Sequence, residues 1–479
     1  MIKKFQLSLV FTLLNAVAFT QGGYQIKLTF KPFKNQYVYL GHYFGKTYPI
    51  IDSALLDANS TAVFKGNKNL QGGIYLIGYP NKAGFFEILI DKNQQFSITA
   101  DTASLPTGIK FENSTDNVLF AAYQKNMVEK GRAFAAMQQQ LKAATTKKDS
   151  SIITEKITAH DKEVMAYRDG IIKNNPDNIL SQFLISMKEP ILTGRLKNPV
   201  NKEDSIASYN YFKTHFWDGV YFWDGRLAYT PFFEDKVEKY YSQLVQPHPD
   251  STIKEIDRML GEASANEEMT RFLLIKFINR YLNQKYMWED AVFVHLFEKY
   301  VSNKEYKWLT KEGRKIITDR AYSLMANIMG TPASDIVLPD INDTVVGLYD
   351  VKASYTLLAF WDPTCGHCKE VLPKLDSIYN AKWKGYNLKI FALAKETEGN
   401  KKDWLDLIAK HKLADWYHVY YAKEDDKLRT SNGIPSYSQL FDIQSFPTLY
   451  LLDKDKRIIA KKLSYEQIDE ILQLKLKGE

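Results

Sequence analysis

The sequence predicts a multidomain protein with a small antiparallel β sandwich-like domain, an all-α helical domain and a C-terminal α/β domain. The chain has 479 residues, more than a single hydrophobic core usually organises. The spacing of its apolar residues also changes twice, near residue 113 and again near residue 330. We therefore expect a signal peptide over residues 1–20, the β domain over 21–110, the helical domain over 111–330 and the α/β domain over 331–479.

The first twenty residues are typical of a secretory signal peptide. Lys3 and Lys4 precede an apolar run from Leu7 to Val17, which small residues follow. A membrane-spanning helix needs roughly 20 apolar residues, so the run favours a cleaved signal over an anchor. Cleavage after Ala18 or Thr20 fits equally well, and no nearby cysteine could carry a lipid. We expect the mature protein to be exported.

The composition is that of an ordinary folded protein, with 45% hydrophobic and 25% charged residues. The net charge is +7, but the basic residues are scattered along the chain instead of forming runs. A nucleic-acid-binding surface needs clustered basic residues. The sequence therefore does not suggest a nucleic-acid partner.

The β and helical domains are predicted from periodicity alone. Short alternating or apolar segments with turn residues between them indicate an antiparallel sandwich: YQIKLTF, QYVYLGHYF, GGIYLIGY, FFEILID and QFSITAD. Helical spacing dominates from about Val118 to Met329, with breaks at proline and glycine that indicate a bundle of helices.

The helical region contains a short repeat, Phe216-Trp217-Asp218-Gly219 followed by Phe222-Trp223-Asp224-Gly225. The repeat could form an aromatic platform for a ligand or partner. Aromatic residues are chiefly core and interface residues, so we favour two Asp-Gly turns whose Trp and Phe side chains pack into a core.

The α/β domain follows from alternating strand and helix patterns after Gly330-Thr331-Pro332. SYTLLAFW and NLKIFALA read as strands, and CKEVLPKLDSIYNAKW and KKDWLDLIAKH read as helices. PTLYLLD and RIIAKKL then read as a closing hairpin, and SYEQIDEILQLKL as a final amphipathic helix. This order predicts a sheet that is parallel at first and antiparallel at its end.

The chain has only two cysteines, Cys365 and Cys368. A bridge between them closes a loop too short to restrict the unfolded chain much, so reversible redox chemistry explains the pair better than stabilisation. The predicted strand ends at Trp361 and the next helix begins at or just before Cys365, where unpaired N–H groups and the helix dipole favour a thiolate. Cys368 lies about one turn into the helix. We expect Cys365 to attack and Cys368 to resolve.

Other uses of a C-x-x-C pair fit less well. A zinc site usually has four ligands, but the chain has no further cysteine. Covalent haem attachment needs a histidine directly after the second cysteine, where this chain has Lys369. His411 and His418 lack carboxylate neighbours, so we expect them at the surface or in packing. We expect neither a metal nor another cofactor.

The segment around the cysteines resembles the active site of TlpA-like thiol-disulfide oxidoreductases of the thioredoxin superfamily. Trp361 precedes the first cysteine by four residues, Pro373 follows the second by five, and Phe446-Pro447-Thr448 precedes a strand. The resemblance implies a thioredoxin-like fold from about Ser334 onwards and a cis bond at Pro447. It also implies that the Phe446 backbone pairs with an extended substrate segment. The order of a β domain, a helical domain and a redox domain is similar to that of exported Gram-negative members.

The sequence also departs from the family. The span from Cys365 to Pro447 is 82 residues, so the domain carries an insert that includes Asp415 to Leu440. The two positions where relatives place an acid hold Ala359 and Val371, and Glu370 is one position early. The proton acceptor for Cys368 therefore stays open between Glu370, His367 and water. Peroxiredoxins place Pro and Thr seven and three residues before their reactive cysteine. Neither residue stands at those positions before Cys365 or Cys368, which argues against peroxide reduction.

The resemblance implies a periplasmic or cell-envelope enzyme that reduces disulfides in protein substrates and receives electrons from a membrane-embedded thiol carrier. The dipeptide Gly366-His367 also occurs in protein disulfide isomerases, which leaves an isomerase or oxidase as an alternative. A third alternative is a binding or scaffolding protein in which residues 24–330 carry the main function.

Overall fold

The computed structural model describes residues 22–413 and 415–477, so the predicted signal peptide lies outside the described residues. The chain divides into two compact units, which we describe separately. Unit 1 comprises residues up to Leu244 together with Leu260–Phe272; unit 2 comprises Val245–Met259 and Leu273 onwards. The helical segment 111–330 contributes to both units. No helix in the two described ranges is long and apolar enough to cross a bilayer.

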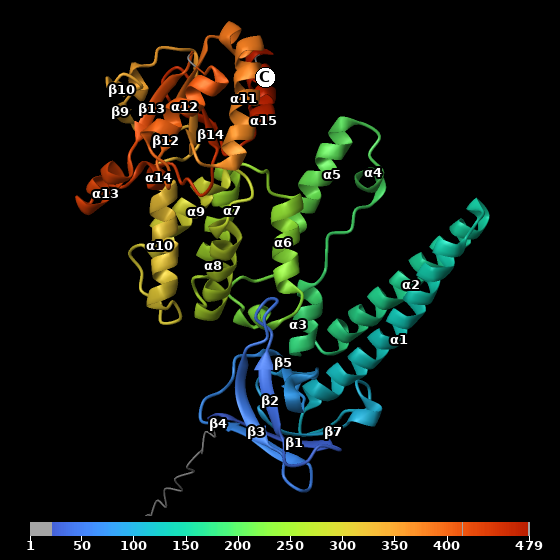
Figure 1. Cartoon of the computed structure of the whole chain (residues 1–479). Helices are drawn as coiled ribbons and strands as arrows, with labels where there is room; N and C mark the ends of the chain where they lie inside the picture. Colours follow the sequence, from blue (N-terminus) through green and yellow to red (C-terminus); the bar gives the residue numbers. More distant parts are fainter. Residues whose placement is uncertain (1–21, 414, 478–479) are drawn as a thin grey trace, which may run out of the picture. The chain divides into compact units, whose positions relative to one another are not determined.

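Unit 1 contains two four-stranded sheets (Figure 1). One has the order β4-β1-β7-β8 and the other β3-β2-β5-β6. Their strands are β1 (Tyr24–Lys31), β2 (Tyr37–His42), β3 (Ile50–Leu55), β4 (Thr61–Gly66), β5 (Gly73–Gly78), β6 (Phe85–Ile90), β7 (Gln95–Asp101) and β8 (Lys110–Glu112). Apolar alternation produces this architecture, since Ile26, Leu28 and Phe30 of β1 are all fully buried.

One strand pair differs from the predicted antiparallel arrangement. β1 pairs with β7 in parallel, with Gln25 opposite Gln95, while the other strand pairs of both sheets are antiparallel. The pairing joins segments about 70 residues apart, which local alternation in a sequence cannot reveal.

The helices of unit 1 follow the sheets. They are α1 (Thr115–Ala143), α2 (Lys147–Asn174), α3 (Ile179–Ser186), α4 (Gly194–Lys197), α5 (Lys202–His215) and α6 (Phe233–Gln243), with short 3₁₀ turns η1 (Pro80–Lys82), η2 (Thr102–Ser104) and η3 (Gly225–Tyr229). α1 and α2 form a long antiparallel hairpin (Figure 1). The division between the units passes through α7 (Pro249–Ala263) and α8 (Glu267–Leu282).

The aromatic repeat is mostly a packing feature. Phe216 and Phe222 are buried, and Trp217 lies between them with ring centroids 4.9 and 5.0 Å away. The expectation of burial is wrong for Trp223, which is 53% exposed and lies against Tyr221. The second Asp-Gly turn therefore keeps its Phe in the core and leaves its Trp at the surface.

Unit 2 contains a five-stranded sheet with the order β13-β12-β11-β14-β15. Its strands are β11 (Tyr355–Trp361), β12 (Leu388–Lys395), β13 (Tyr417–Tyr421), β14 (Thr448–Leu452) and β15 (Ile458–Lys461). β11, β12 and β13 are parallel, and β14 and β15 are antiparallel to their neighbours. The predicted parallel start and antiparallel end are confirmed, but β13 was not predicted. It lies in the insert and supplies the edge strand next to β12.

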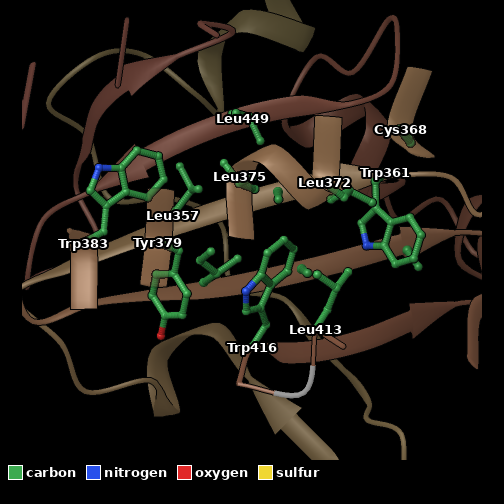
Figure 2. Close-up of a cluster of buried hydrophobic side chains, with 14 of the residues drawn as sticks. Leu357, Trp361, Cys368, Leu372, Leu375, Tyr379, Trp383, Leu413, Trp416 and Leu449 are labelled. Atoms are coloured by element: carbon green, nitrogen blue, oxygen red, sulfur yellow. The ribbon is translucent and has the colours of Figure 1, made fainter. Parts of the chain in front are cut away.

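The other elements of unit 2 surround this sheet. They are α9 (Glu289–Leu296), the π-helical turn η4 (Phe297–Val301), α10 (Lys311–Met325), a small hairpin of β9 (Val337–Pro339) and β10 (Val345–Gly347), η5 (Leu348–Asp350), α11 (Gly366–Ala381), η6 (Trp383–Tyr386), α12 (Lys401–His411), α13 (Lys423–Ser431), α14 (Tyr437–Leu440) and α15 (Tyr465–Lys477). The sheet is buried on both faces, because Leu357, Ala359 and Trp361 of β11 enter one cluster and Leu358 and Phe360 enter another. Figure 2 shows the first cluster, where α11 packs on the sheet. This two-sided burial explains the continuous apolar run of β11.

Candidate active site

The turn between β11 and α11 positions Cys365. β11 ends at Trp361 and α11 begins at Gly366, so Cys365 is the N-cap residue of the helix. The Cys365 amide donates to the carbonyl of Asp362 at 3.2 Å, and the Cys365 carbonyl accepts from the Lys369 amide at 3.3 Å. The sulfur therefore lies at a helix N-terminus, where the helix dipole favours an anion.

The two cysteines have different environments. Both are free thiols in the structure; Cys365 is partly exposed and Cys368 is 0% exposed. Burial raises the pKa of the Cys368 thiol, and the hydrogen bond and charge of Cys365 raise it further. A backbone hydrogen bond from Asp362 acts in the opposite direction. Cys365 is accessible to a substrate sulfur, while Cys368 is accessible only from within the site.

The proline loop faces the accessible cysteine. The Phe446-Pro447 peptide bond is cis, as the sequence predicts. The Cys365 Sγ lies 3.6 Å from the carbonyl oxygen of Phe446, with the thiol as donor. β14 begins directly after this bond, at Thr448, and pairs with β11. Sheet pairing therefore holds two segments together that are far apart in the sequence.

Trp361 packs in the hydrophobic core next to the site. It is 0% exposed and belongs to the same cluster as Leu372 and Cys368 (Figure 2). Its indole Nε1 is buried and has no hydrogen-bond partner within the described ranges. Trp361 therefore contributes packing beneath the turn.

His367 and Glu370 lie on the solvent side of α11. Their side chains are 67% and 75% exposed, and His367 Nδ1 lies 3.9 Å from Glu370 Oε2. Ala359 is buried in the core, and Val371 lines the groove described below. Ala359 and Val371 occupy the positions where relatives place an acid, so neither position supplies a carboxylate beside Cys368.

Asp362 does supply a buried carboxylate, and we did not predict a role for it. It is 4% exposed, and its Oδ1 accepts from the amide and the hydroxyl of Thr364, both at 2.6 Å. Its Oδ2 accepts from the Thr397 hydroxyl, which lies beyond the end of β12. The sequence Asp-Pro-Thr is a signal for an Asx turn, but the contact with Thr397 depends on the tertiary fold.

A groove lies beside the proline loop. It has a volume of about 490 Å³, and its walls come from α11, the proline loop and the start of α15. His367, Pro447 and Lys462 are among its lining residues. We call it the site groove.

The insert histidines do not form part of this arrangement. His418 is 3% exposed and stacks on Trp416, and its Nε2 lies 2.7 Å from the Leu413 carbonyl. Burial lowers the pKa of His418 to about 4. His418 is therefore a packing residue, one of the two roles that the sequence predicted. Within the described ranges, no group of three or more His, Cys, Asp or Glu side chains could hold a metal ion.

Comparisons with known proteins give two family matches within the chain. Residues 353–458 match the Thioredoxin-like family, and residues 139–323 match a domain of unknown function (DUF5106). The chain is 28% identical over 149 residues to the thiol-disulfide oxidoreductase ResA of Bacillus cereus, which covers 30% of this chain and 77% of ResA.

Two solved structures are also similar. A domain of a possible thiol-disulfide isomerase from Cytophaga hutchinsonii is 34% identical, with 31% of this chain and 94% of that chain covered and a TM-score of 0.27. A thioredoxin-like protein from Bacteroides caccae is 20% identical, with 60% and 98% covered and a TM-score of 0.43.

The family match covers β11, β12, β13 and β14, both cysteines and the proline loop. The ResA similarity covers more than two thirds of that relative. The C-terminal part of this chain is therefore a thioredoxin-like domain, and it is similar to the thiol-disulfide oxidoreductase ResA.

Proposed function

We propose that this chain reduces disulfides in exported protein substrates through Cys365-Gly366-His367-Cys368. The observation that carries the proposal is the contrast between the two sulfurs. Cys365 is partly exposed at a helix N-terminus and contacts the Phe446 carbonyl, whereas Cys368 is fully buried one turn further along. One accessible and one sequestered sulfur suit attack followed by resolution.

The reaction is an exchange of two electrons. The Cys365 thiolate attacks one sulfur of the substrate disulfide, the other substrate sulfur leaves as a thiolate, and a mixed disulfide forms. The Cys368 thiolate then attacks Cys365 Sγ and releases the second substrate sulfur. The substrate gains two electrons and two protons in total, and the chain is left with a Cys365–Cys368 disulfide. A membrane-embedded thiol carrier would return the enzyme to its dithiol form.

The N-terminal sequence supports the proposed compartment. Residues 1–20 are typical of a signal peptide, and a redox enzyme of this kind acts where protein disulfides persist, in the periplasm or cell envelope of a Gram-negative bacterium.

The Cys368→Ala variant tests this mechanism. It should accumulate substrates as mixed disulfides with Cys365, visible as adducts that a reductant removes. The Cys365→Ala variant is the matched control and should trap none. Absence of reducible adducts on Cys368→Ala in cells would contradict substrate exchange through this pair.

Two alternatives have specific support. The Gly366-His367 dipeptide favours an isomerase or oxidase, and a redox titration distinguishes this role, because a strongly oxidising potential would count against a reductase. A cavity of about 680 Å³ in unit 1 favours a binding role; it is lined mainly by apolar side chains of α1, α2 and α3. If a variant lacking both cysteines kept every cellular phenotype, the binding role would be the main one.

A further inference from the structure

The site groove contains a buried carboxylate, Asp442, four residues before Phe446. Asp442 is 6% exposed and has a φ of 47°, in the left-handed region that few side chains adopt without support. It lines the groove together with Lys462, at the end of β15. Its carboxylate therefore lies in the wall of the groove beside the proline loop.

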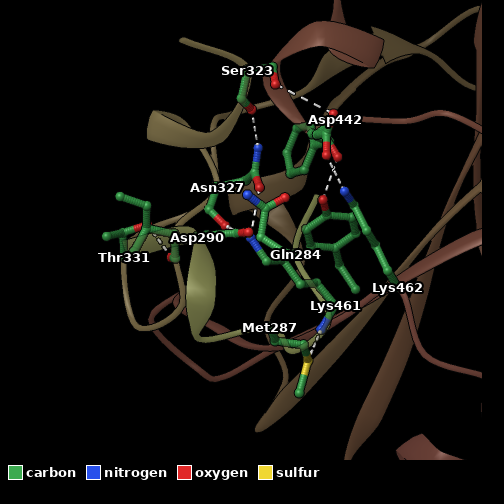
Figure 3. A network of polar contacts seen from close by, with 12 residues as sticks. Gln284, Met287, Asp290, Ser323, Asn327, Thr331, Asp442, Lys461 and Lys462 are labelled. Carbon is green, nitrogen blue, oxygen red and sulfur yellow. Dashed lines mark hydrogen bonds and ion pairs between the residues drawn. The ribbon is translucent and has the colours of Figure 1, made fainter. Parts of the chain in front are cut away.

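Two cations hold this carboxylate. Arg320 Nη1 donates to Asp442 Oδ1 at 2.7 Å. Lys462 Nζ pairs with Asp442 Oδ2 (Figure 3). Gln444 also donates to Oδ1, at 3.2 Å. Burial acts to raise the pKa of Asp442, but the bonds from Arg320 and Lys462 outweigh it and lower the pKa. Asp442 is therefore an anion shared by two cations.

Arg320 comes from the helical segment, not from the thioredoxin-like sheet. It lies on α10, and its guanidinium also donates to the Leu282 carbonyl and to Gln284. Nearby, Asn327, just after α10, donates to the carbonyl of Leu440 at the end of α14 at 3.0 Å, so α10 and the residues that follow it contact the segment before the proline at two points. These contacts all lie within unit 2. The helical segment thus sets both the position and the charge of the groove wall.

The charged residues in and behind the wall of the site groove give it a net positive charge. Among the lining residues, Lys374 and Lys462 carry positive charge and Asp442 and Glu466 carry negative charge, which cancel. Arg320 adds one positive charge directly behind Asp442. Within the described part of the chain, Lys462 Nζ donates one hydrogen bond, to Asp442, and its side chain is 35% exposed. An ammonium group has three donors, so Lys462 retains donors for a ligand.

We infer that the site groove selects disulfide substrates that carry acidic side chains beside the reacting cysteine, and that Arg320 sets this preference by neutralising Asp442. This inference rests on the proposed function, since it assumes that Cys365 attacks a substrate disulfide. Arg320 is a positioning and specificity residue: it contacts Asp442, and Lys462 contacts the substrate. The helical segment is therefore a working part of the redox site.

Matched peptides test this preference. Three peptide disulfides with the same small leaving thiol carry glutamate, glutamine or lysine on both sides of the cysteine. The full chain with Cys368→Ala is reduced, and the rate of mixed-disulfide formation on Cys365 is measured for each peptide. Each rate is divided by the rate with 2-mercaptoethanol, a neutral thiol, because flanking charge alters the intrinsic reactivity of the peptide.

The normalised rate for the glutamate peptide should exceed that for the lysine peptide by roughly threefold to tenfold at low salt, and the ratio should approach one at 1 M salt. Adding Arg320→Met should remove most of the preference, measured as the ratio of the glutamate to the lysine rate within that variant. Arg320→Lys should retain part of the preference. Lys475→Met removes an exposed lysine on α15 that does not line the groove, and it should change nothing.

Lys462→Met provides a second variant if Arg320→Met fails to fold, and it should also reduce the preference. A glutamate-to-lysine ratio of one or less in the Cys368→Ala background would overturn the inference. A ratio that survives both Arg320→Met and Lys462→Met would overturn it as well. If all three peptides reacted equally, only this inference would fail. If none formed an adduct on Cys365, the proposed function itself would fail.

Discussion

A buried ion pair between β15 and α9 should make Lys461→Met severely destabilising. Lys461 is 2% exposed and Asp290 is 5% exposed. The Lys461 ammonium donates to Asp290 and to both the carbonyl and the side-chain oxygen of Asn327 (Figure 3). Replacing the lysine leaves Asp290 buried without its counter-charge, which typically costs about 3–5 kcal/mol.

Chemical denaturation measures this loss. Tryptophan fluorescence reports mainly on unit 2, because only Trp217 and Trp223 lie in unit 1. The exposed pair of Lys315 with Asp319 gives the control, since the two side chains are 74% and 61% exposed and Lys315→Met should have too small an effect to resolve. The double variant Lys461→Met, Asp290→Leu should recover most of the loss. A loss below about 1 kcal/mol for Lys461→Met would refute the reasoning, because it would mean that Asp290 finds solvent or another partner at little cost.

Three further predictions concern unit 2. His418 has a pKa lowered by burial from 6.5 to about 4, so the unfolded chain binds more protons between these values. The contribution of this group to the free energy of unfolding should therefore be complete above pH 6.5 and fall by about 2 kcal/mol by pH 5. His418→Gln should remove that part of the pH dependence in denaturation curves. Asp362→Asn should lower the pKa of Cys368, measured by alkylation against pH, because the negative charge of Asp362 raises it; an unchanged or higher value would contradict this sign. Cys368 should alkylate far more slowly than Cys365 in the dithiol, and faster once Cys365 carries an S-methyl thioether, which Cys368 cannot displace; equal rates with and without this thioether would contradict the coupling between the two sulfurs.

The sequence predicted those parts of the fold whose signal is local. Apolar periodicity marks β11, α11, β12 and α12, and the turn before Cys365 also marks the start of α11. β13 was missed because YHVYY lies within a polar insert, and its burial depends on pairing with β12. The parallel pairing of β1 with β7 was missed for a related reason, since register across the chain has no local signal.

The same distinction applies to the site. The spacing of Cys365, Cys368 and Pro447 could be read directly, and the structure brings the proline loop to the first sulfur. Asp362 was not assigned a role, because its partner Thr397 lies 35 residues away and joins it only through the pairing of β11 with β12. Asp442 was missed because the significance of its charge depends on Arg320, which belongs to a different part of the chain.

The buried resolving cysteine can be understood without an acid at Ala359 or Val371. Two of the effects that raise the pKa of Cys368, after burial itself, come from Cys365: its hydrogen bond and its charge. When Cys365 forms a mixed disulfide its sulfur carries no charge and becomes a weaker acceptor for the Cys368 thiol, so both effects diminish. The backbone hydrogen bond from Asp362, which lowers the pKa of Cys368, does not depend on the state of Cys365. Substrate attack therefore makes the Cys368 thiolate easier to form at the step that requires it, and resolution is linked to capture by the electrostatics of the pair.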